Sequence, residues 1–193
     1  MTTNRAPRPA TGASDEGVAL RVLPGGDDAS RSLDAIYRRY CRYVGAVILR
    51  LDGRAVDLED RIQDVFAEAA QGLESLRQPE AIKGWLATIA VRLVRKQLRR
   101  RRLRRFLWLD NGGDTNYTDL ADRAASPVDK LLVTEVYRVL DDVSVDDRLA
   151  FSLHHIEGET LQSVAKLCGC SLATTKRRIA RAHRVLTERL PNV

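Results

Sequence analysis

The sequence has few aromatic residues and no long apolar run. Phe, Trp and Tyr together make up 5% of its 193 residues. Because the apolar residues are mostly Leu, Val, Ala and Ile, the composition favours packed helices over a sheet. No run reaches the roughly 20 apolar residues that a membrane-spanning helix needs. Met1–Ala13 also lacks the apolar stretch of a signal peptide. We therefore expect a cytoplasmic protein without membrane insertion.

Motifs of enzymes and metal sites are also scarce. Three cysteines, an odd number in a chain of this length, do not make a disulfide framework. We find no glycine-rich phosphate loop and no paired-carboxylate site, and Cys41 has no recognisable His or carboxylate helper. The spacing of Cys168 and Cys170 differs from the two-residue gap usual in zinc sites. Buried thiols are favoured over zinc held with His154 and His155. We predict no catalytic residues, no enzyme activity, no cofactor and no metal.

Charge is abundant, and it is unevenly distributed. Lys and Arg number 32 against 26 Asp and Glu, a net charge of +6. Residues 81–109 contain ten basic side chains and no acidic one, whereas residues 56–75 contain six acidic side chains and only Arg61 as a base. An acidic helix next to a basic helix predicts two kinds of partner, one basic and one polyanionic.

Apolar residues at helical spacing predict a first domain of three helices. The apolar stripes cover residues 33–51, 58–76 and 85–94, and the third continues into an arginine-rich segment. Gly53 is expected to end the first helix and Pro79 the second. The connections are short, so the three helices should form one small helical domain.

A second helical domain is predicted after a linker. Asn111–Asp114 has the composition of a turn, and Ser126 followed by Pro127 suits the start of a helix. The apolar segment Phe106–Leu109 is expected to dock either on a domain or on a partner. The fold class is all-α, with two small helical domains on a flexible linker. The predicted boundaries are a disordered tail at 1–31, a first domain at 32–103, a linker at 104–127 and a second domain at 128–193.

Residues 159–186 have the pattern of a helix-turn-helix. Gly169 can take the positive φ that the turn needs, and Ser171 is a good N-cap. The second helix is predicted to bury Leu172, Ile179, Ala182, Val185 and Leu186. It is predicted to expose Thr174, Thr175, Lys176, Arg177, Arg178, Arg181 and Arg184. Cationic and hydrogen-bonding side chains on such a helix suit the major groove of DNA.

The arginine run at residues 99–105 is a weaker signal, because basic runs are often only solvated. It continues a helix that carries Trp85, Arg92, Arg95 and Lys96. Cations beside a ring that can stack on a base suit a duplex being opened. For Trp85 itself, a place in the core is favoured over a base contact.

Three segments resemble the extracytoplasmic-function (ECF, group IV) sigma factors of the sigma-70 family. Asp57–Phe66 (DLEDRIQDVF) resembles the acidic helix that grips the clamp helices of the largest polymerase subunit. Trp85–Ala90 (WLATIA) resembles the helix after the loop that captures a flipped base of the −10 element. Glu157–Leu190 is similar to the domain that reads the −35 element. The resemblance covers about residues 33–102 (region 2-like) and 131–190 (region 4-like).

The resemblance implies a sigma factor that binds core RNA polymerase and directs promoter recognition, DNA melting and transcription initiation. By position, the polymerase-binding residues would be Asp57, Glu59, Asp60, Gln63, Asp64 and Glu68. The −10 and melting residues would be Lys83, Trp85, Arg92, Arg95, Lys96 and Arg99, beside a base-selecting loop at 74–82. The −35 residues would be Ser171, Thr174, Lys176, Arg177, Arg178, Ala180, Arg181, Arg184 and His154. The implied partners are the clamp helices, the flap of the second-largest subunit and promoter DNA, with an anti-sigma factor as a further candidate.

The chain departs from the family pattern at three places. Val91 and Arg92 stand where Asn is common, and His154 replaces a longer cation, which bears on the promoter sequence. Arg61 stands where an apolar residue is common in the clamp-binding helix, which bears on polymerase affinity. The alternative function is a stand-alone helix-turn-helix regulator. It explains the basic helix after Ser171 but gives the acidic helix no role. A third possibility is a sigma-like protein that acts mainly through protein contacts, which overexposed apolar faces would favour.

Overall fold

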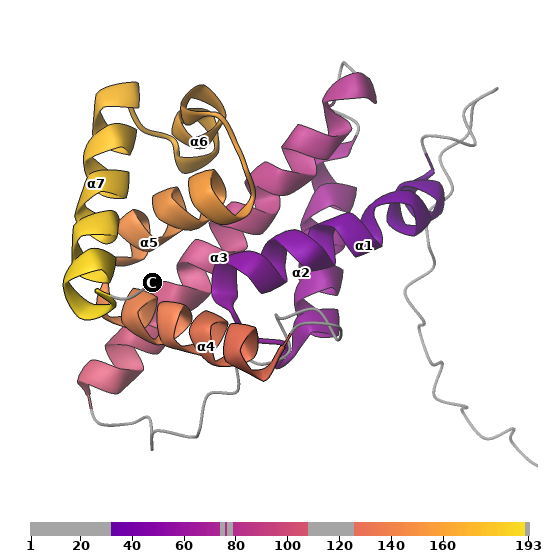
Figure 1. Cartoon of the computed structure of the whole chain (residues 1–193). Coiled ribbons are helices and arrows are strands. Elements are labelled where there is room, and N and C mark those ends of the chain that lie inside the picture. Colours follow the sequence, from indigo (N-terminus) through magenta and orange to yellow (C-terminus); the bar gives the residue numbers. More distant parts are fainter. Residues whose placement is uncertain (1–31, 74–75, 77–78, 108–125, 192–193) are drawn as a thin grey trace, which may run out of the picture.

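The structure is a computed structural model that describes residues 32–73, 76, 79–107 and 126–191. The predicted tail at 1–31 and most of the predicted linker lie outside these residues. Every regular element in the described part of the chain is helical, as predicted (Figure 1). None of these helices combines the length and the apolar character that crossing a membrane demands. The elements are α1 (Leu33–Asp52), α2 (Leu58–Gly72), the 3₁₀ helix η3 (Pro79–Ala81), α3 (Ile82–Phe106), α4 (Pro127–Asp142), α5 (Val145–Phe151), the π-helical turn η5 (Ser152–Ile156), α6 (Leu161–Cys168) and α7 (Leu172–Arg189).

Most helix ends follow the predicted local signals. Gly53, with φ of 77°, ends α1. Ser126 starts α4 with a capping box, in which its hydroxyl accepts the Asp129 N–H and the Asp129 carboxylate accepts the Ser126 N–H. Ser171 caps α7 through the Thr174 N–H. The predicted end of the second helix at Pro79 is wrong, because α2 ends at Gly72, a residue of low helix propensity.

Helices α1, α2 and α3, called here the first half, pack around a core of aliphatic side chains. The predicted stripes are confirmed, since their central residues are the buried ones. Tyr37 and Phe66 meet edge-on, with ring centroids 4.8 Å apart. The fully buried members are Val44, Leu51, Val65, Leu86, Ala90 and Val91.

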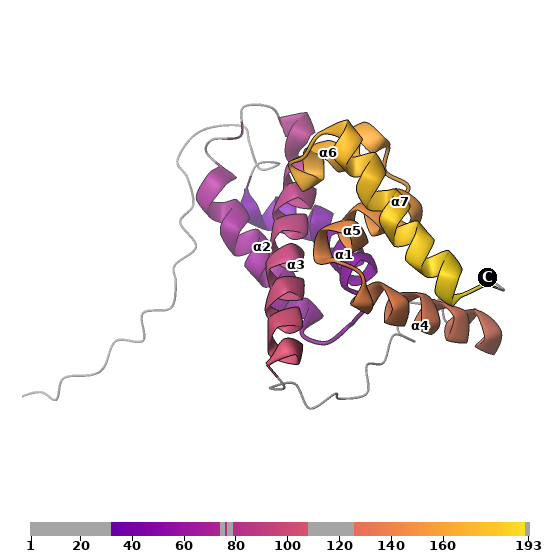
Figure 2. The ribbon, with the colours of Figure 1, turned by 90° about the vertical axis from the view of Figure 1, so that its left-hand side faces the viewer.

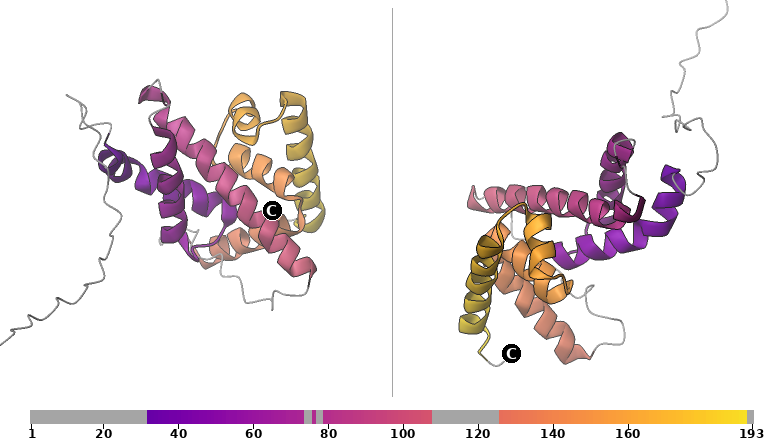
Figure 3. Two further views of the ribbon diagram at one scale, coloured as in Figure 1. Left: turned by 180° about the vertical axis from the view of Figure 1, so that it is seen from behind. Right: turned by 90° about the horizontal axis from the view of Figure 1, so that it is seen from above.

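Helices α4 to α7, called here the second half, pack directly on the first half. Their buried residues Leu149, Leu153, Val164 and Cys168 belong to the same apolar cluster as the core of α1–α3. Figure 2 shows α3 between α2 and the second half, and in the rear view of Figure 3 α3 runs diagonally across the second half. A smaller cluster, centred on Leu140, joins α4 to α5 and α7.

A buried carboxylate at the end of α1 ties the helices of the first half together. Asp52 is 1% exposed and forms ion pairs with Arg61 of α2 and with Arg101 of α3, the second at 2.7 Å. Burial is the main cause that lowers the pKa of Arg101 below its usual value. Arg101 also lies 3.5 Å from a carboxylate oxygen of Asp141 in α4. The network therefore reaches into the second half.

Arg148 of α5 completes this network from the second half. Its guanidinium donates to the Asp52 carbonyl at 2.7 Å and to the Asp141 carboxylate, and its side chain is 2% exposed. Arg54 pairs with Asp141 at 3.0 Å, and the Tyr137 hydroxyl donates to the Arg50 carbonyl at 2.5 Å. The two halves thus share a polar core as well as an apolar one. This network is called the Asp52–Asp141 hub below.

The two faces of α7 differ from the prediction. Val185, expected in the core, and Thr174 and Arg178, expected at the surface, are half-buried, and two further residues are reversed. Thr175, expected at the surface, is fully buried, while Leu172, expected in the core, is 37% exposed. The buried residues Thr175, Ile179, Ala182 and Leu186 follow a spacing of four, three and four, which makes one continuous stripe. The Thr175 hydroxyl donates to the Ser171 carbonyl at 3.2 Å, so its burial leaves no polar group unsatisfied.

The register of α7 can be tested by placing a lysine on either side of the helix. Thr175→Lys should lower the free energy of unfolding by about 3 kcal/mol or more, because it buries an unpaired charge. Ala173→Lys adds the same charge at an exposed position of the same helix and should change it by less than about 0.5 kcal/mol. Urea unfolding followed by circular dichroism measures both. Equal tolerance of the two variants would contradict this register.

The contribution of the hub can be tested at Arg148. Arg148→Met keeps most of the side-chain volume but removes one of the buried cations that pair with Asp141 and the donor to the Asp52 carbonyl, so we expect a loss of about 3–5 kcal/mol in the free energy of unfolding. Arg100→Met, at an exposed arginine of α3, is the matched control and should have little effect. A loss below about 1 kcal/mol in Arg148→Met would show that the hub does not hold the halves together.

Candidate nucleic-acid interface

The outer face of α7 carries a row of exposed cations. Lys176, Arg177, Ala180 and Arg184 are all exposed and fall at helical spacing on one side of the helix. The hydroxyls of Ser171 and Thr174 lie 2.9 Å apart at its first turn. A helix N-terminus with free donors and nearby cations is suited to phosphate groups. The structure therefore brings most of the predicted −35 residues onto one surface.

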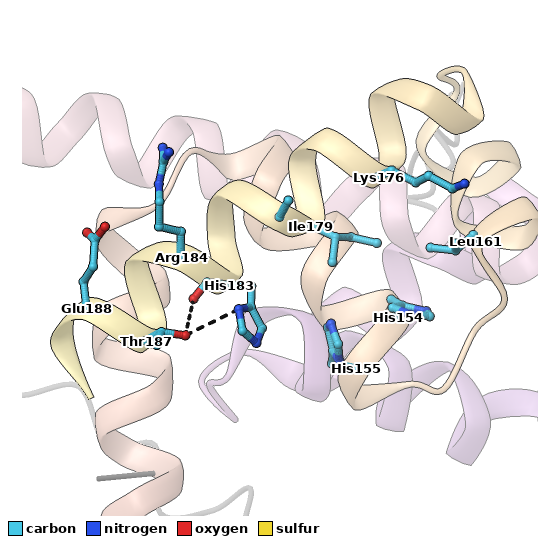
Figure 4. Close-up of a pocket in the computed structure, with 10 residues that line it drawn as sticks. His154, His155, Leu161, Lys176, Ile179, His183, Arg184, Thr187 and Glu188 are labelled. Atoms are coloured by element: carbon cyan, nitrogen blue, oxygen red, sulfur yellow. Dashed lines mark hydrogen bonds between the residues drawn. The ribbon is translucent and has the colours of Figure 1, made fainter. Parts of the chain in front are cut away.

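A shallow groove of about 700 Å³ runs beside this row (Figure 4). It is lined by Ile179, Lys176 and Arg184 of α7 and by Leu161 of α6. His154 of η5 lines the same groove. It thus lies near Lys176 and Arg184 of α7, which the sequence resemblance also assigned to the −35 element. The His154 ring nitrogen Nδ1 lies 2.8 Å from the Glu159 carbonyl, which fixes the ring.

Three histidines meet at this groove, a feature that the sequence did not reveal. The ring of His155 lies 4.8 Å from that of His154 and 6.3 Å from that of His183. Burial, and then the two neighbouring histidines, lower the pKa of His155. This shift favours the uncharged form of its ring. In the described residues, no group of three or more His, Cys, Asp or Glu side chains is arranged to hold a metal ion.

The predicted −10 and melting residues on α3 do not share one free surface. Arg95 and Arg99 point to α5, where both form ion pairs with Asp146 at 3.1 and 3.0 Å. Arg92 pairs with Glu68 of α2, whereas Lys96 is exposed. Of the cations on this helix, only some are thus available to a ligand in this conformation.

The N-terminal part of α3 packs on α1 and α2. Trp85 is half-buried, and a Cβ at Gly72 would come within 2.9 Å of its ring, so the glycine makes room for the indole. This agrees with the favoured place of Trp85 in the core. The Lys83 ammonium lies 4.7 Å from the centroid of the Tyr43 ring, a cation–π distance.

The arginine run on α3 is largely occupied by the second half. Arg101 is in the buried hub, Arg102 donates to the Val143 carbonyl at 3.0 Å, and Arg105 donates to the Asp141 carbonyl at 3.0 Å. These arginines act as a clamp on the end of α4. The sequence suggested that this arginine run contacts nucleic acid. It did not reveal that Arg101, Arg102 and Arg105 bind polar groups of the protein itself.

The acidic face of α2 is open. Five of the six predicted polymerase-binding residues are exposed, and they form no ion pair with any other described residue. Glu68 is half-buried and paired with Arg92. Arg61, the departure from the family pattern, turns inward to Asp52 and so leaves the acidic face uninterrupted. The exposed residues are Asp57, Glu59, Asp60, Gln63 and Asp64.

Two acidic residues in the first turn of α5 were not singled out from the sequence. Asp146 faces Arg95, Arg99 and Arg178, and Asp147 accepts two hydrogen bonds from Arg181 at 2.9 and 2.6 Å. Hydrogen bonding of the Arg181 guanidinium to the Asp147 carboxylate is the main cause that raises the pKa of Arg181. Acidic residues in a first helical turn are common, so their sequence position alone gave no signal.

Comparison with known proteins identifies both halves. The model of sigma-70 region 2 matches residues 36–104, and the model of sigma-70 region 4 matches residues 134–186. The chain is 26% identical over 185 residues to the ECF RNA polymerase sigma-E factor of Haemophilus influenzae, covering 92% of this chain and 95% of that protein. It is 28% identical over 179 residues to the ECF RNA polymerase sigma factor SigE of Mycolicibacterium smegmatis, covering 92% and 69%.

A third relative is longer. The chain is 30% identical over 151 residues to the probable RNA polymerase sigma factor RfaY of Xanthomonas campestris. The match covers 76% of this chain but only 37% of that protein.

Among solved structures, the sigma factor RpoE in complex with the anti-sigma factor NepR from Bartonella quintana superposes with a TM-score of 0.60 and 23% identity. The match covers 84% of this chain and 98% of RpoE. CnrH in complex with the cytosolic domain of CnrY gives a TM-score of 0.56 and 20% identity, covering 85% and 90%. At these identities the two structures support the fold alone.

The matches to region 2 and region 4 lie on the first and second halves, and together they span more than half of the chain. The relatives above that it covers to two thirds or more are sigma factors of one type. The chain therefore belongs to the sigma-70 family, as an RNA polymerase sigma factor of the extracytoplasmic-function type.

Proposed function

We propose that the two halves of this sigma factor divide promoter recognition between them. Residues 32–103 would bind the polymerase clamp and the −10 element, and residues 128–193 would bind the −35 element, as in a minimal group IV factor. Polymerase performs the chemistry, and this chain supplies promoter specificity and strand opening. Because it works with polymerase on the chromosome, we expect it to act in the cytoplasm.

The observation that carries this proposal is the open acidic face of α2. Carboxylates that have no cation within the described part of the chain are available to a basic partner, and the clamp helices of the largest subunit are our proposed partner. A stand-alone helix-turn-helix regulator would need the cations of α7 but not this face. We infer that Asp60 and Asp64, one turn apart on α2, are central to it.

The −35 contacts are assigned to the exposed row on α7. Lys176 and Arg177 would reach base edges, and Arg184 with the groove residue His154 would lie near phosphates. Arg178 and Arg181 can join only after leaving Asp146 and Asp147. The −10 side is assigned to Lys83, Lys96 and the arginines of α3. The base-selecting loop at 74–82 lies partly outside the described residues.

Two further partners follow from the same assignment. The flap of the second-largest polymerase subunit is proposed to bind the second half. An anti-sigma factor is proposed as a regulator. The support for it is that RpoE and CnrH, which share the fold, were solved with NepR and CnrY.

Run-off transcription tests the function as a whole. Purified bacterial core polymerase with this protein should give transcripts that start at defined sites on a library of promoter fragments, and core alone should not. Asp60→Lys combined with Asp64→Lys should abolish both core binding and these transcripts, because the open acidic face becomes basic. Glu135→Lys, which alters a half-buried acid of α4 that is paired with Arg138, is the control. Specific duplex binding without core binding would favour the stand-alone regulator.

The recognition helix is tested by Lys176→Ala. Loss of one base contact should weaken use of the cognate promoter by about 1–3 kcal/mol and relax the sequence preference at one −35 position. Arg138→Ala removes an exposed cation of α4 whose one ion pair within the described residues is with Glu135, three residues earlier, and should leave promoter choice unchanged. Promoter selection that is identical in both variants would show that α7 does not read the −35 element.

A further inference from the structure

All the histidines of the chain lie in the groove beside the recognition helix. The sequence has three histidines, and His154 and His155 of η5 and His183 of α7 all line this groove. In Figure 4 the three rings follow one another along it. Histidine is the side chain whose ordinary pKa puts its change of charge between pH 5 and 8. Its titration is thus concentrated next to the surface that we assign to the −35 element.

The hydrogen bond of His154 determines what its ring can offer a phosphate. Nδ1 lies 2.8 Å from the Glu159 carbonyl, and because a carbonyl oxygen only accepts, Nδ1 carries the proton in this contact. In the neutral ring Nε2 is then an acceptor, which cannot form a hydrogen bond to a phosphate oxygen. Protonation of the ring turns Nε2 into a donor and adds a positive charge. His154 can therefore donate to a phosphate through Nε2 only in its charged form.

His183 is held in a similar way by its own helix. The Thr187 hydroxyl donates to the His183 carbonyl at 3.0 Å and lies 3.4 Å from the His183 Nδ1 (Figure 4). Because the hydroxyl proton is directed to the carbonyl, its oxygen is left to accept from the Nδ1–H group. The neutral ring again leaves Nε2 as an acceptor. One histidine on η5 and one on α7 thus gain a donor for phosphate only on protonation.

His155 lies between these two rings, and its charged form is disfavoured when no anion is bound. Its ring centroid is 4.6 Å from that of Phe151, 4.8 Å from that of His154 and 6.3 Å from that of His183. Burial, followed by the two neighbouring histidines, lowers the pKa of His155. Phosphate groups in the groove would act in the opposite direction and raise it, because an anion favours the charged ring.

Cations outnumber acids among the other groups that line the groove. Lys176 and Arg184 of α7 face it together with the acid Glu188, and α6 contributes the apolar Leu161. A proton added to any of the three histidines therefore increases a positive potential. Such a potential is unfavourable in the free chain and favourable beside a polyanion.

The acids nearest to η5 on its other sides are already paired. Glu157 forms an ion pair with Arg50 of α1, and Asp147 of α5 forms one with Arg181. Paired carboxylates are weak counter-ions for a further cation, so the charge on the histidines must be balanced from outside the chain. The remaining charged and titratable groups around η5 are Glu159, Tyr43 of α1, Tyr137 of α4, and Asp146 and Arg148 of α5.

We propose that the protonated histidines of this groove bind the phosphates of the −35 duplex, so that promoter affinity increases as the pH falls. The proposal rests on the proposed function and adds its regulation. Binding and protonation are linked reciprocally, since a duplex that binds the charged rings better also makes them easier to protonate. The affinity is constant above the pKa values of the bound state, rises as the pH falls through them, and levels off below the pKa values of the free protein. One histidine whose pKa the duplex raises by one unit gives about a tenfold gain.

Promoter binding by the holoenzyme at two pH values tests this inference. Core polymerase is assembled with the unchanged protein or with the triple variant His154→Gln, His155→Gln and His183→Gln. Binding to a fluorescent fragment of the promoter identified by run-off transcription is measured at about pH 6 and about pH 8, at one salt concentration. The affinity of the unchanged protein relative to the variant should increase about tenfold between the higher and the lower pH. The comparison removes the pH response of polymerase itself.

Two single variants separate charge from the other roles of these residues. His154→Arg places a permanent cation in the groove, so it should bind the promoter more tightly than the unchanged protein at about pH 8 and gain less at about pH 6. Arg184→Gln removes a cation of the same groove that stays charged throughout this range, so it should weaken binding by a similar factor at both pH values. Circular dichroism at both pH values checks that each variant is folded.

The outcomes distinguish this inference from the proposed function. The same loss of affinity in the triple variant at both pH values overturns the inference, as does a His154→Arg variant that binds no better than the unchanged protein at the higher pH. If holoenzyme with the unchanged protein bound no promoter fragment at either pH, the proposed function would be overturned, and the inference with it. The two failures differ in whether the unchanged protein binds.

Discussion

The buried pair of carboxylates in the Asp52–Asp141 hub is the constraint on which the arrangement of the two halves depends. Asp52 is 1% exposed and Arg148 has a side chain exposed by only 2%. Removing such charges from water costs several kcal/mol per ion, and the cost is offset only when every partner is in place. Sliding α4 or α5 along α3 would leave Asp141 or Arg101 buried without a partner. The hub thus selects one orientation of the halves, whereas the apolar contacts around it would tolerate several.

That orientation decides which parts of the surface are free. With α5 fixed against α3, its first turn reaches Arg95 and Arg99, while the acidic face of α2 and the outer face of α7 point away. The contacts differ in solvent exposure. Asp52, Arg101 and Arg148 of the hub are buried, whereas the side chain of Asp146 is 27% exposed and that of Arg99 is 60% exposed. Salt therefore weakens the ion pairs of Asp146 with Arg95 and Arg99 more than it weakens those of the hub. These exposed ion pairs are the ones that a competing polyanion can displace.

The sequence predicted what is local and missed what depends on packing. Gly53, Ser126 and Ser171 were identified correctly because positive φ and N-capping are properties of a few adjacent residues. Thr175 was misplaced, since its polarity suggested the surface while a bond to the Ser171 carbonyl, four residues before it, lets it be buried. The site residues were chosen by type and by resemblance. Their availability could not be predicted, because the partner of Arg95 lies 51 positions further along the chain at Asp146.

The arginine-rich end of α3 shows how one segment can stabilise the fold and still suit a polyanionic partner. Arginine remains charged at any physiological pH and accepts no hydrogen bond, so each guanidinium needs an anionic or carbonyl partner. Within the folded chain Arg102 and Arg105 donate to the carbonyl oxygens of Val143 and Asp141, and Arg99 donates to the carboxylate of Asp146. Phosphate oxygens can accept the same hydrogen bonds, including two at once from one guanidinium. Exchanging one set of acceptors for the other would therefore conserve the hydrogen bonds of these arginines, and the balance between the two sets depends on charge and counterion release.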